Sequence, residues 1–135
     1  MEHIEPGLSA EQTTTVDEAQ LATRMGSGAV AVYATPAMIA LIEAAAVAAI
    51  DPLLPAGQAS VGIALEVKHL AATPPGQQVR ARAEVTAVDG RKVILKVQAW
   101  DEHELIGKGT HTRYVVDLAR FNARAAAKHT SPETN

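Results

Sequence analysis

Glu43 is the only Asp, Glu, Lys or Arg between Arg24 and Asp51, and the stretch around it is almost entirely apolar. Burying a carboxylate penalises its charged form, so a position that tolerates such burial is a candidate for acid/base or nucleophilic chemistry. The same pattern also fits a carboxylate at an exposed edge of a helix, or one held by a structural hydrogen bond. Glu43 is therefore the first candidate catalytic residue.

His69 is the second candidate. It continues an apolar alternation that begins at Val61 and includes Leu65 and Val67, so we expect its side chain on the buried face of a strand. If the helix that carries Glu43 covers that face, the two side chains lie near each other. A neutral imidazole near pH 7 can act as a base or bind a water molecule, although a histidine on an apolar face can also be an ordinary core residue.

Thr35 is the third candidate. It precedes Pro36, which is typical of an N-cap followed by proline at the first helical position. Free amides at a helix N-terminus can polarise a carbonyl group. Eight residues separate Thr35 from Glu43, which is about 12 Å of helical rise, so spacing alone does not bring the two side chains to one reacting atom.

Three further residues are weaker candidates. Gly62 interrupts an otherwise regular strand, which indicates either a close approach of a ligand or a β-bulge. Arg113 and His111 alternate with Tyr114 and Val116, so we expect them on the solvent face of the last strand, where an arginine could bind a phosphate or be merely solvated.

The elements that must position these residues form a short series. An apolar, alanine-rich helix is predicted from Thr35 to about Ile50, because Pro36 opens it and Asp51-Pro52 closes it. One strand is expected before it and four consecutive antiparallel strands after it. Their approximate ranges are 8–16, 59–69, 79–87, 93–99 and 105–118, followed by a short basic helix from about residue 119. This order predicts an α+β hotdog fold, a five-stranded antiparallel sheet wrapped around one long central helix, as a single domain over residues 1–135 with a disordered tail from about 129.

Composition narrows the possible partners. The 135 residues carry a net charge of −3 with scattered basic residues, which argues against a nucleic-acid partner. The apolar helix has about 15 residues and a central glutamate, which is too short and too polar for a membrane span. The chain contains no Cys and shows no spacing typical of metal ligands, so neither a metal nor another cofactor is expected. The absence of Cys and of a signal peptide at the start favours a cytoplasmic location.

Several motifs resemble the fluoroacetyl-CoA thioesterase-like family of hotdog proteins. They are GSGAVAVYATPAMIALIE at 26–43, SVGIALEVKHLAATPPG at 60–76, GKGTHTR at 107–113 and FNA at 121–123. The resemblance implies that Thr35, Glu43 and His69 are the catalytic threonine, glutamate and histidine. It also implies that Gly62 and Arg113 contact the substrate. A homodimer with its site at the interface, acting on an acyl thioester of coenzyme A, is implied as well.

The chain departs from that family at the acyl pocket. The fluoroacetyl-specific enzyme has phenylalanines just before its threonine, whereas this chain has small residues there, among them Ala29. We therefore expect hydrolysis of short or medium acyl-CoAs without fluoroacetyl selectivity. A hotdog hydratase or dehydratase and a non-catalytic acyl-CoA-binding module are the alternatives, and release of free thiol distinguishes hydrolysis from both.

Overall fold

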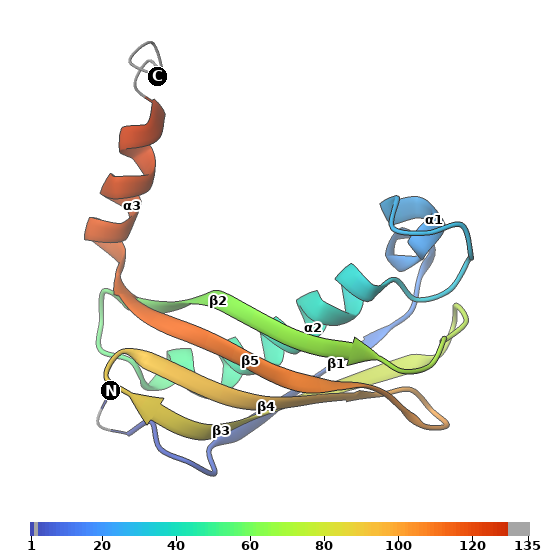
Figure 1. Ribbon diagram of the computed structural model, residues 1–135, viewed down its shortest axis with the longest axis horizontal. Coiled ribbons are helices and arrows are strands. Elements are labelled where there is room, and N and C mark those ends of the chain that lie inside the picture. Colours follow the sequence, from blue (N-terminus) through green and yellow to red (C-terminus); the bar gives the residue numbers. More distant parts are fainter. Residues whose placement is uncertain (2, 130–135) are drawn as a thin grey trace.

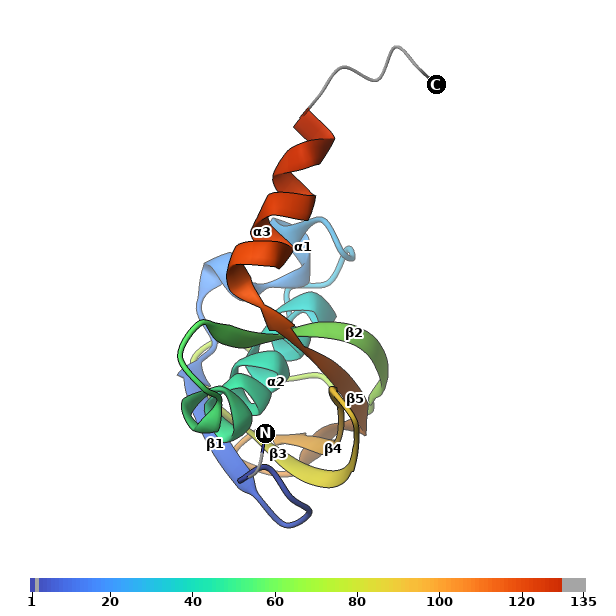
Figure 2. The ribbon, with the colours of Figure 1, turned by 90° about the vertical axis from the view of Figure 1, so that its left-hand side faces the viewer.

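The computed structural model describes Met1 and residues 3–129, so the expected disordered tail lies, beyond His129, outside the described residues. Five strands form one antiparallel sheet in the order β1-β3-β4-β5-β2. The strands are β1 (Ser9–Thr15), β2 (Gln58–His69), β3 (Gln78–Asp89), β4 (Lys92–Trp100) and β5 (Leu105–Asp117). The sheet curls around the long helix α2 (Thr35–Ile50), as Figure 2 shows. The predicted α+β hotdog architecture is confirmed.

The core lies between α2 and the concave face of the sheet. Met38, Ile42 and Ile50 are fully buried on the helix. The strands present short or branched side chains toward them, all of them buried: Val79, Ala81, Ala83, Val85, Val93, Leu95, Val97 and Ala99. The inward residues of β3 are its alternating apolar ones up to Val85, where a register shift relative to β4 begins. The helical segment Thr35–Leu53 has the length and hydropathy of a membrane span, and its buried residues are part of this core.

A β-bulge in β2 changes the expected alternation of that strand. Gly62 pairs with Arg113 and Ala64 pairs with Thr112, so Ile63 is the extra residue. After the bulge, Leu65 and His69 face the helix as predicted. Before it, Ser60 and Gly62 take that face, and Ile63 is 53% exposed. A uniform inward phase from Val61 onward was therefore wrong, because the bulge shifts one half of the strand by a residue.

The phase predicted for β5 was also wrong. His111 and Arg113 are buried with 0% and 5% exposure, whereas Tyr114 is 40% exposed. The pairing explains the inversion, since His111 lies opposite the buried Leu95 of β4, and residues paired across antiparallel strands point to the same face. Both polar side chains therefore point toward α2.

The two ends of the molecule carry different helices. The short helices η1 (Glu18–Gln20) and α1 (Ala22–Met25), which were not predicted, lie with the start of α2 at one end (Figure 1). Helix α3 (Leu118–Ala126), with η3 (Ala127–His129) after it, projects from the other end. β2 and β1 are the two edges of the sheet, and β2 is the longer.

Candidate active site

Thr35 and His69 form the first half of the candidate site. Their Oγ1 and Nδ1 atoms are 2.7 Å apart, at the start of α2 and the end of β2. A pocket of about 290 Å³ opens here, and Tyr33 and Leu70 also contribute to its wall. The predicted N-cap role of Thr35 is wrong, because Ala34 holds the N-cap position and no side chain caps the helix. The Thr35 hydroxyl contacts the imidazole instead.

The environment of His69 favours its neutral form. Burial lowers the pKa of His69 below its usual value, so the imidazole is uncharged at neutral pH. A neutral imidazole with its proton on Nε2 can accept the hydroxyl proton of Thr35 at Nδ1. Nε2 is buried and has no hydrogen bond of good geometry to a described residue, and the nearby Ala71 backbone partly offsets the effect of burial on the pKa of His69.

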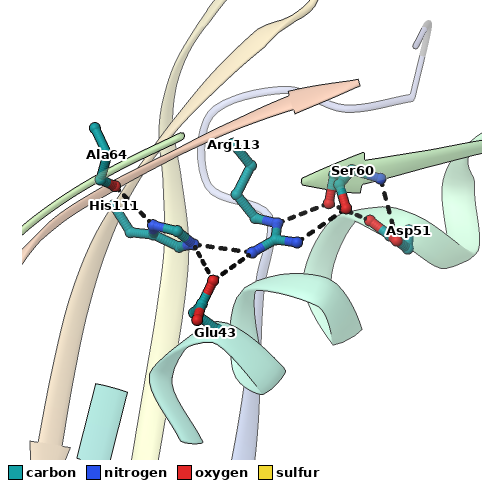
Figure 3. A network of polar contacts seen from close by, with 6 residues as sticks. All are labelled: Glu43, Asp51, Ser60, Ala64, His111 and Arg113. Atoms are coloured by element: carbon teal, nitrogen blue, oxygen red, sulfur yellow. Dashed lines mark hydrogen bonds and ion pairs between the residues drawn. The ribbon is translucent and has the colours of Figure 1, made fainter. Parts of the chain in front are cut away.

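Glu43 belongs to a second polar cluster, shown in Figure 3. Its Oε2 lies 3.3 Å from Nη1 of Arg113 and 3.9 Å from Nε2 of His111. The Glu43 side chain is 39% exposed, so the expected desolvated carboxylate is instead a half-exposed one opposite a buried guanidinium. This pairing explains how a single acidic residue is accommodated on an apolar helix.

Arg113 is held rigidly in this cluster. Its Nε donates to Oγ of Ser60 at 2.7 Å, and its Nη2 donates to the Ser60 carbonyl at 2.9 Å. Ser60 in turn donates to Asp51 at the end of α2, with 2.6 Å between the oxygens. Two nitrogens of the guanidinium, Nε and Nη2, are thus hydrogen-bonded to acceptors on Ser60, and the third, Nη1, points toward Glu43.

His111 has a defined tautomer. Its Nδ1 lies 2.9 Å from the carbonyl oxygen of Ala64, which can only accept, so Nδ1 carries the proton. Nε2 is then the acceptor for Nη1 of Arg113 at 3.0 Å. Burial, with a smaller contribution from the Arg113 charge, lowers the pKa of His111 and keeps it neutral. His111 therefore helps to orient the guanidinium that faces Glu43.

Gly62 completes the second cluster by its lack of a side chain. A Cβ there would lie 2.7 Å from Oε2 of Glu43 and 3.1 Å from Cε1 of His111. Of the two predicted alternatives the bulge is confirmed, since the register shift begins at this residue. The close approach is to the Glu43 carboxylate of the same chain.

The five predicted site residues thus fall into two groups within one chain: Thr35 with His69, and Glu43 with Arg113 and Gly62. Among the described residues, the polar contacts of Glu43 are with Arg113 and His111, and none is with Thr35 or His69. Sequence reasoning missed the supporting roles of Ser60, Asp51 and His111. The signal that could have found Ser60 is its two-residue spacing from Gly62 on the same strand.

Comparison with known proteins supports a common family. Residues 16–119 match the model of the family described as fluoroacetyl-CoA-specific thioesterase. A fluoroacetyl-CoA thioesterase from Streptantibioticus cattleyicolor is 45% identical over 97 residues, which cover 72% of this chain and 70% of that protein.

Solved structures give the same result. The structure of a fluoroacetyl-CoA thioesterase superposes with a TM-score of 0.87 at 34% identity, covering 96% of this chain and 98% of that one. A threonine-to-serine variant of a fluoroacetyl-CoA enzyme, solved in complex with acetyl-CoA, gives 0.88 at 34% identity with 93% and 99% covered. A thioesterase superfamily member from Thermus thermophilus gives 0.90 at 30% identity over the full length of both chains.

Proposed function

The chain belongs to the fluoroacetyl-CoA-specific thioesterase family, and we propose that it hydrolyses a short or medium acyl-CoA thioester to the free acid and CoA. The observation that carries this proposal is the 2.7 Å contact between the Thr35 hydroxyl and the neutral His69 imidazole beside a pocket. A hydroxyl next to a neutral imidazole is an arrangement suited to proton transfer during acyl transfer.

The geometry supports a division of roles. In hydrolysis, water adds to the thioester carbonyl carbon, the C–S bond breaks, and the departing thiolate takes up a proton. His69 can accept a proton during the addition and return it to the sulfur. The positive end of the α2 dipole, where Thr35 stands, stabilises the charge that develops on the carbonyl oxygen.

Glu43 is the acidic group of the predicted catalytic set, and we assign it to the site of the partner subunit in a homodimer. β2 is a 12-residue edge strand with exposed apolar side chains, among them Ile63 at 53% and Leu65 at 40%. Such an edge favours pairing with another strand. Antiparallel pairing of β2 with its copy about a two-fold axis sets the middle of one strand beside the middle of the other.

This pairing has a consequence for Glu43. The carboxylate lies against Gly62, near the middle of β2, and is therefore close to the proposed axis. Each Glu43 would then face the β2 strand of the partner, which ends at His69. A composite site of this kind accounts for the separation of the two groups of residues within one chain.

Subunit complementation tests the composite site. Thr35→Ala and Glu43→Gln homodimers should each have little activity. If the two residues act from different chains, a mixed dimer carries one site with both substitutions and one with neither. A 1:1 mixture with random reassortment should then regain about a quarter of wild-type activity. Failure to regain activity, with mixed dimers shown by mass spectrometry, would mean that Glu43 acts with the Thr35 of its own chain.

Release of free thiol from acetyl-, butyryl- and hexanoyl-CoA tests the reaction itself. Hydrolysis yields CoA, whereas a hydratase leaves the thioester intact and a binding module leaves the substrate unchanged. Light scattering should return twice the 14.1 kDa chain mass at micromolar concentration, and a monomer would exclude the shared interface. We propose a cytoplasmic enzyme, and the absence of Cys in the chain fits a reducing compartment. We also propose that it meets its substrate in solution without a membrane, because buried residues of the apolar helix α2 pack in the protein's own core.

A further inference from the structure

A basic hollow lies between β5 and α3, at the opposite end of the chain from Thr35. It has a volume of about 290 Å³. Three arginines, Arg91, Arg120 and Arg124, and two aromatic residues, Tyr114 and Phe121, line it. Tyr114 and Phe121 are each 40% exposed. We call these five residues the basic hollow.

The basic hollow carries more positive than negative charge. Its lining includes one carboxylate, that of Asp117, which accepts the backbone N–H of Arg120. Among residues 1 and 3–129, no carboxylate forms an ion pair with any of its three arginines. Arg91 donates to the carbonyl of Val115, and Arg120 and Arg124 are four residues apart, on one side of α3. This concentration of positive charge stands out on a chain whose net charge is −3.

Helix α3 lacks the packing that would by itself explain its position. None of its residues is buried, and it projects from the sheet in both views (Figures 1 and 2). An isolated helix of nine residues is marginally stable in water, so contacts beyond this chain's own core should hold it. A bound ligand at its first two turns would supply such contacts.

We propose that the basic hollow binds the phosphorylated nucleotide end of the CoA substrate. Guanidinium groups form charge-assisted, bidentate hydrogen bonds with phosphates, and exposed aromatic faces stack with nucleobases. An acidic carrier protein would also be attracted to three arginines. A concave site with two aromatic rings fits a base and its phosphates better than it fits a protein surface.

The inference rests on the proposed function. The proposed dimer brings the hollow to the same end of the molecule as the partner's candidate active site. Gln58, at the start of β2, pairs with Asp117, which lines the hollow, whereas His69 lies at the other end of the strand. The two ends are about 35 Å apart within one chain. Antiparallel pairing of two β2 strands sets the start of one beside the end of the other. Each hollow then lies at the same end of the paired strands as the Thr35–His69 pair of the partner, and the pantetheine arm of CoA can span the remaining distance between them.

The test compares substrates with and without the nucleotide. In Arg120→Ala/Arg124→Ala, KM for butyryl-CoA should rise about tenfold or more while kcat stays near wild type, because each lost phosphate contact weakens binding and not the chemical step. KM for butyryl-pantetheine, which has no nucleotide, should not change. Adenosine 3′,5′-bisphosphate should bind to the wild type in calorimetry and lose affinity in the double variant by a similar factor.

Two further variants keep the result interpretable. Arg80→Ala removes an exposed arginine on β3, away from the hollow, and should leave KM unchanged. Arg120→Lys/Arg124→Lys retains charge and helix propensity and should raise KM for butyryl-CoA by a smaller factor, which covers the case in which the alanine variant does not fold.

Three outcomes would overturn the inference. The first is a KM for butyryl-CoA that is unchanged in both double variants, provided that the wild type hydrolyses butyryl-CoA. The second is an equal rise for the pantetheine substrate. The third is a KM that rises for an acyl thioester of a carrier protein but not for butyryl-CoA, which would assign the hollow to a protein partner. A wild type that releases no thiol from either small substrate would instead refute the proposed function, and binding of the bisphosphate would still report on the hollow.

Discussion

Gly62→Ala should damage activity far more than it damages the fold. The backbone of Gly62 does not have a positive φ, so alanine brings no backbone strain, and its whole effect is the added methyl group. That Cβ would stand 2.7 Å from Oε2 of Glu43, 3.1 Å from Cε1 of His111 and 3.3 Å from Nη1 of Arg113. Ordinary contact begins near 3.4 Å, so the carboxylate oxygen must retreat by about 0.7 Å.

The size of the effect follows from which atoms can move. Glu43 is half-exposed and flexible, whereas His111 and Arg113 are buried and held by several hydrogen bonds. Glu43 therefore moves most and loses its contact with Arg113. A catalytic group displaced by about 1 Å can lower the rate by about 100-fold. Overpacking against the two buried side chains should lower the free energy of unfolding by about 1 to 3 kcal/mol.

The assay is kcat/KM for butyryl-CoA by thiol release, together with urea unfolding. We expect a fall of about 100-fold in kcat/KM in a protein that remains folded and dimeric. In a Glu43→Ala background the methyl group no longer meets a carboxylate, so Gly62→Ala should reduce activity little further. Wild-type activity in Gly62→Ala would refute the reasoning. It would also be refuted if the fold-losses in kcat/KM of Gly62→Ala and Glu43→Ala multiplied in the double variant, because the two changes would then be independent.

Other expected outcomes address the remaining groups. Glu43→Gln and His69→Ala should each lower kcat by about 100-fold or more with unchanged circular dichroism, and near-wild-type turnover in either would make it a structural residue. Arg113→Met should lower the free energy of unfolding by about 2 to 4 kcal/mol because it leaves buried acceptors unpaired. Arg82→Met, which removes a partly exposed pair with Glu84, should cost less than about 1 kcal/mol in the same urea titration. Burial lowers the pKa of His69 and of His111 from 6.5, so below pH 6.5 the unfolded chain takes up protons that the folded chain does not. Stability should therefore fall as the pH drops from 7.5 to 5.5, and unfolding curves that coincide at the two pH values would contradict this. The small side chains before α2 should give kcat/KM values for fluoroacetyl- and acetyl-CoA that differ by less than about 1,000-fold, because an apolar pocket discriminates weakly between small acyl groups.

The sequence predicted the framework well because regular alternation and proline position report directly on packing. The limits of α2 followed from Pro36 and Asp51, and the inward faces of β3 and β4 followed from their apolar residues. Asp89-Gly90 is typical of a two-residue hairpin turn, and the observed turn lies one residue later, at Gly90 and Arg91. In these elements local pattern and tertiary structure agree.

The errors concentrate in the strands that carry the site. The inward face of β5 holds Gly107, His111 and Arg113, so a rule that places apolar residues inside selects the wrong face. Arg113 can be buried only because Ser60 and Glu43 satisfy its fork, and both partners are far from it in the chain. Hydrogen-bond partners that are distant in the chain cannot be inferred from the polarity of single residues. Polar residues buried against the local pattern are expected at functional sites.

Thr35 illustrates a different limit. Threonine before proline is typical of a cap, and the local signal gave no reason to expect a bond to a residue 34 positions away. The structure assigns its hydroxyl to His69 because the end of β2 passes the start of α2.

The bulge in β2 allows the two halves of that strand to vary independently of each other. Ser60 and Gly62, before the extra residue, serve the Glu43 cluster, whereas His69, after it, serves Thr35. A gain or loss of one residue at Ile63 would change the alternation of one half relative to the other. Mutation can therefore alter one cluster while the strand remains in the sheet, so the two halves of the site can diverge separately among descendants of this fold.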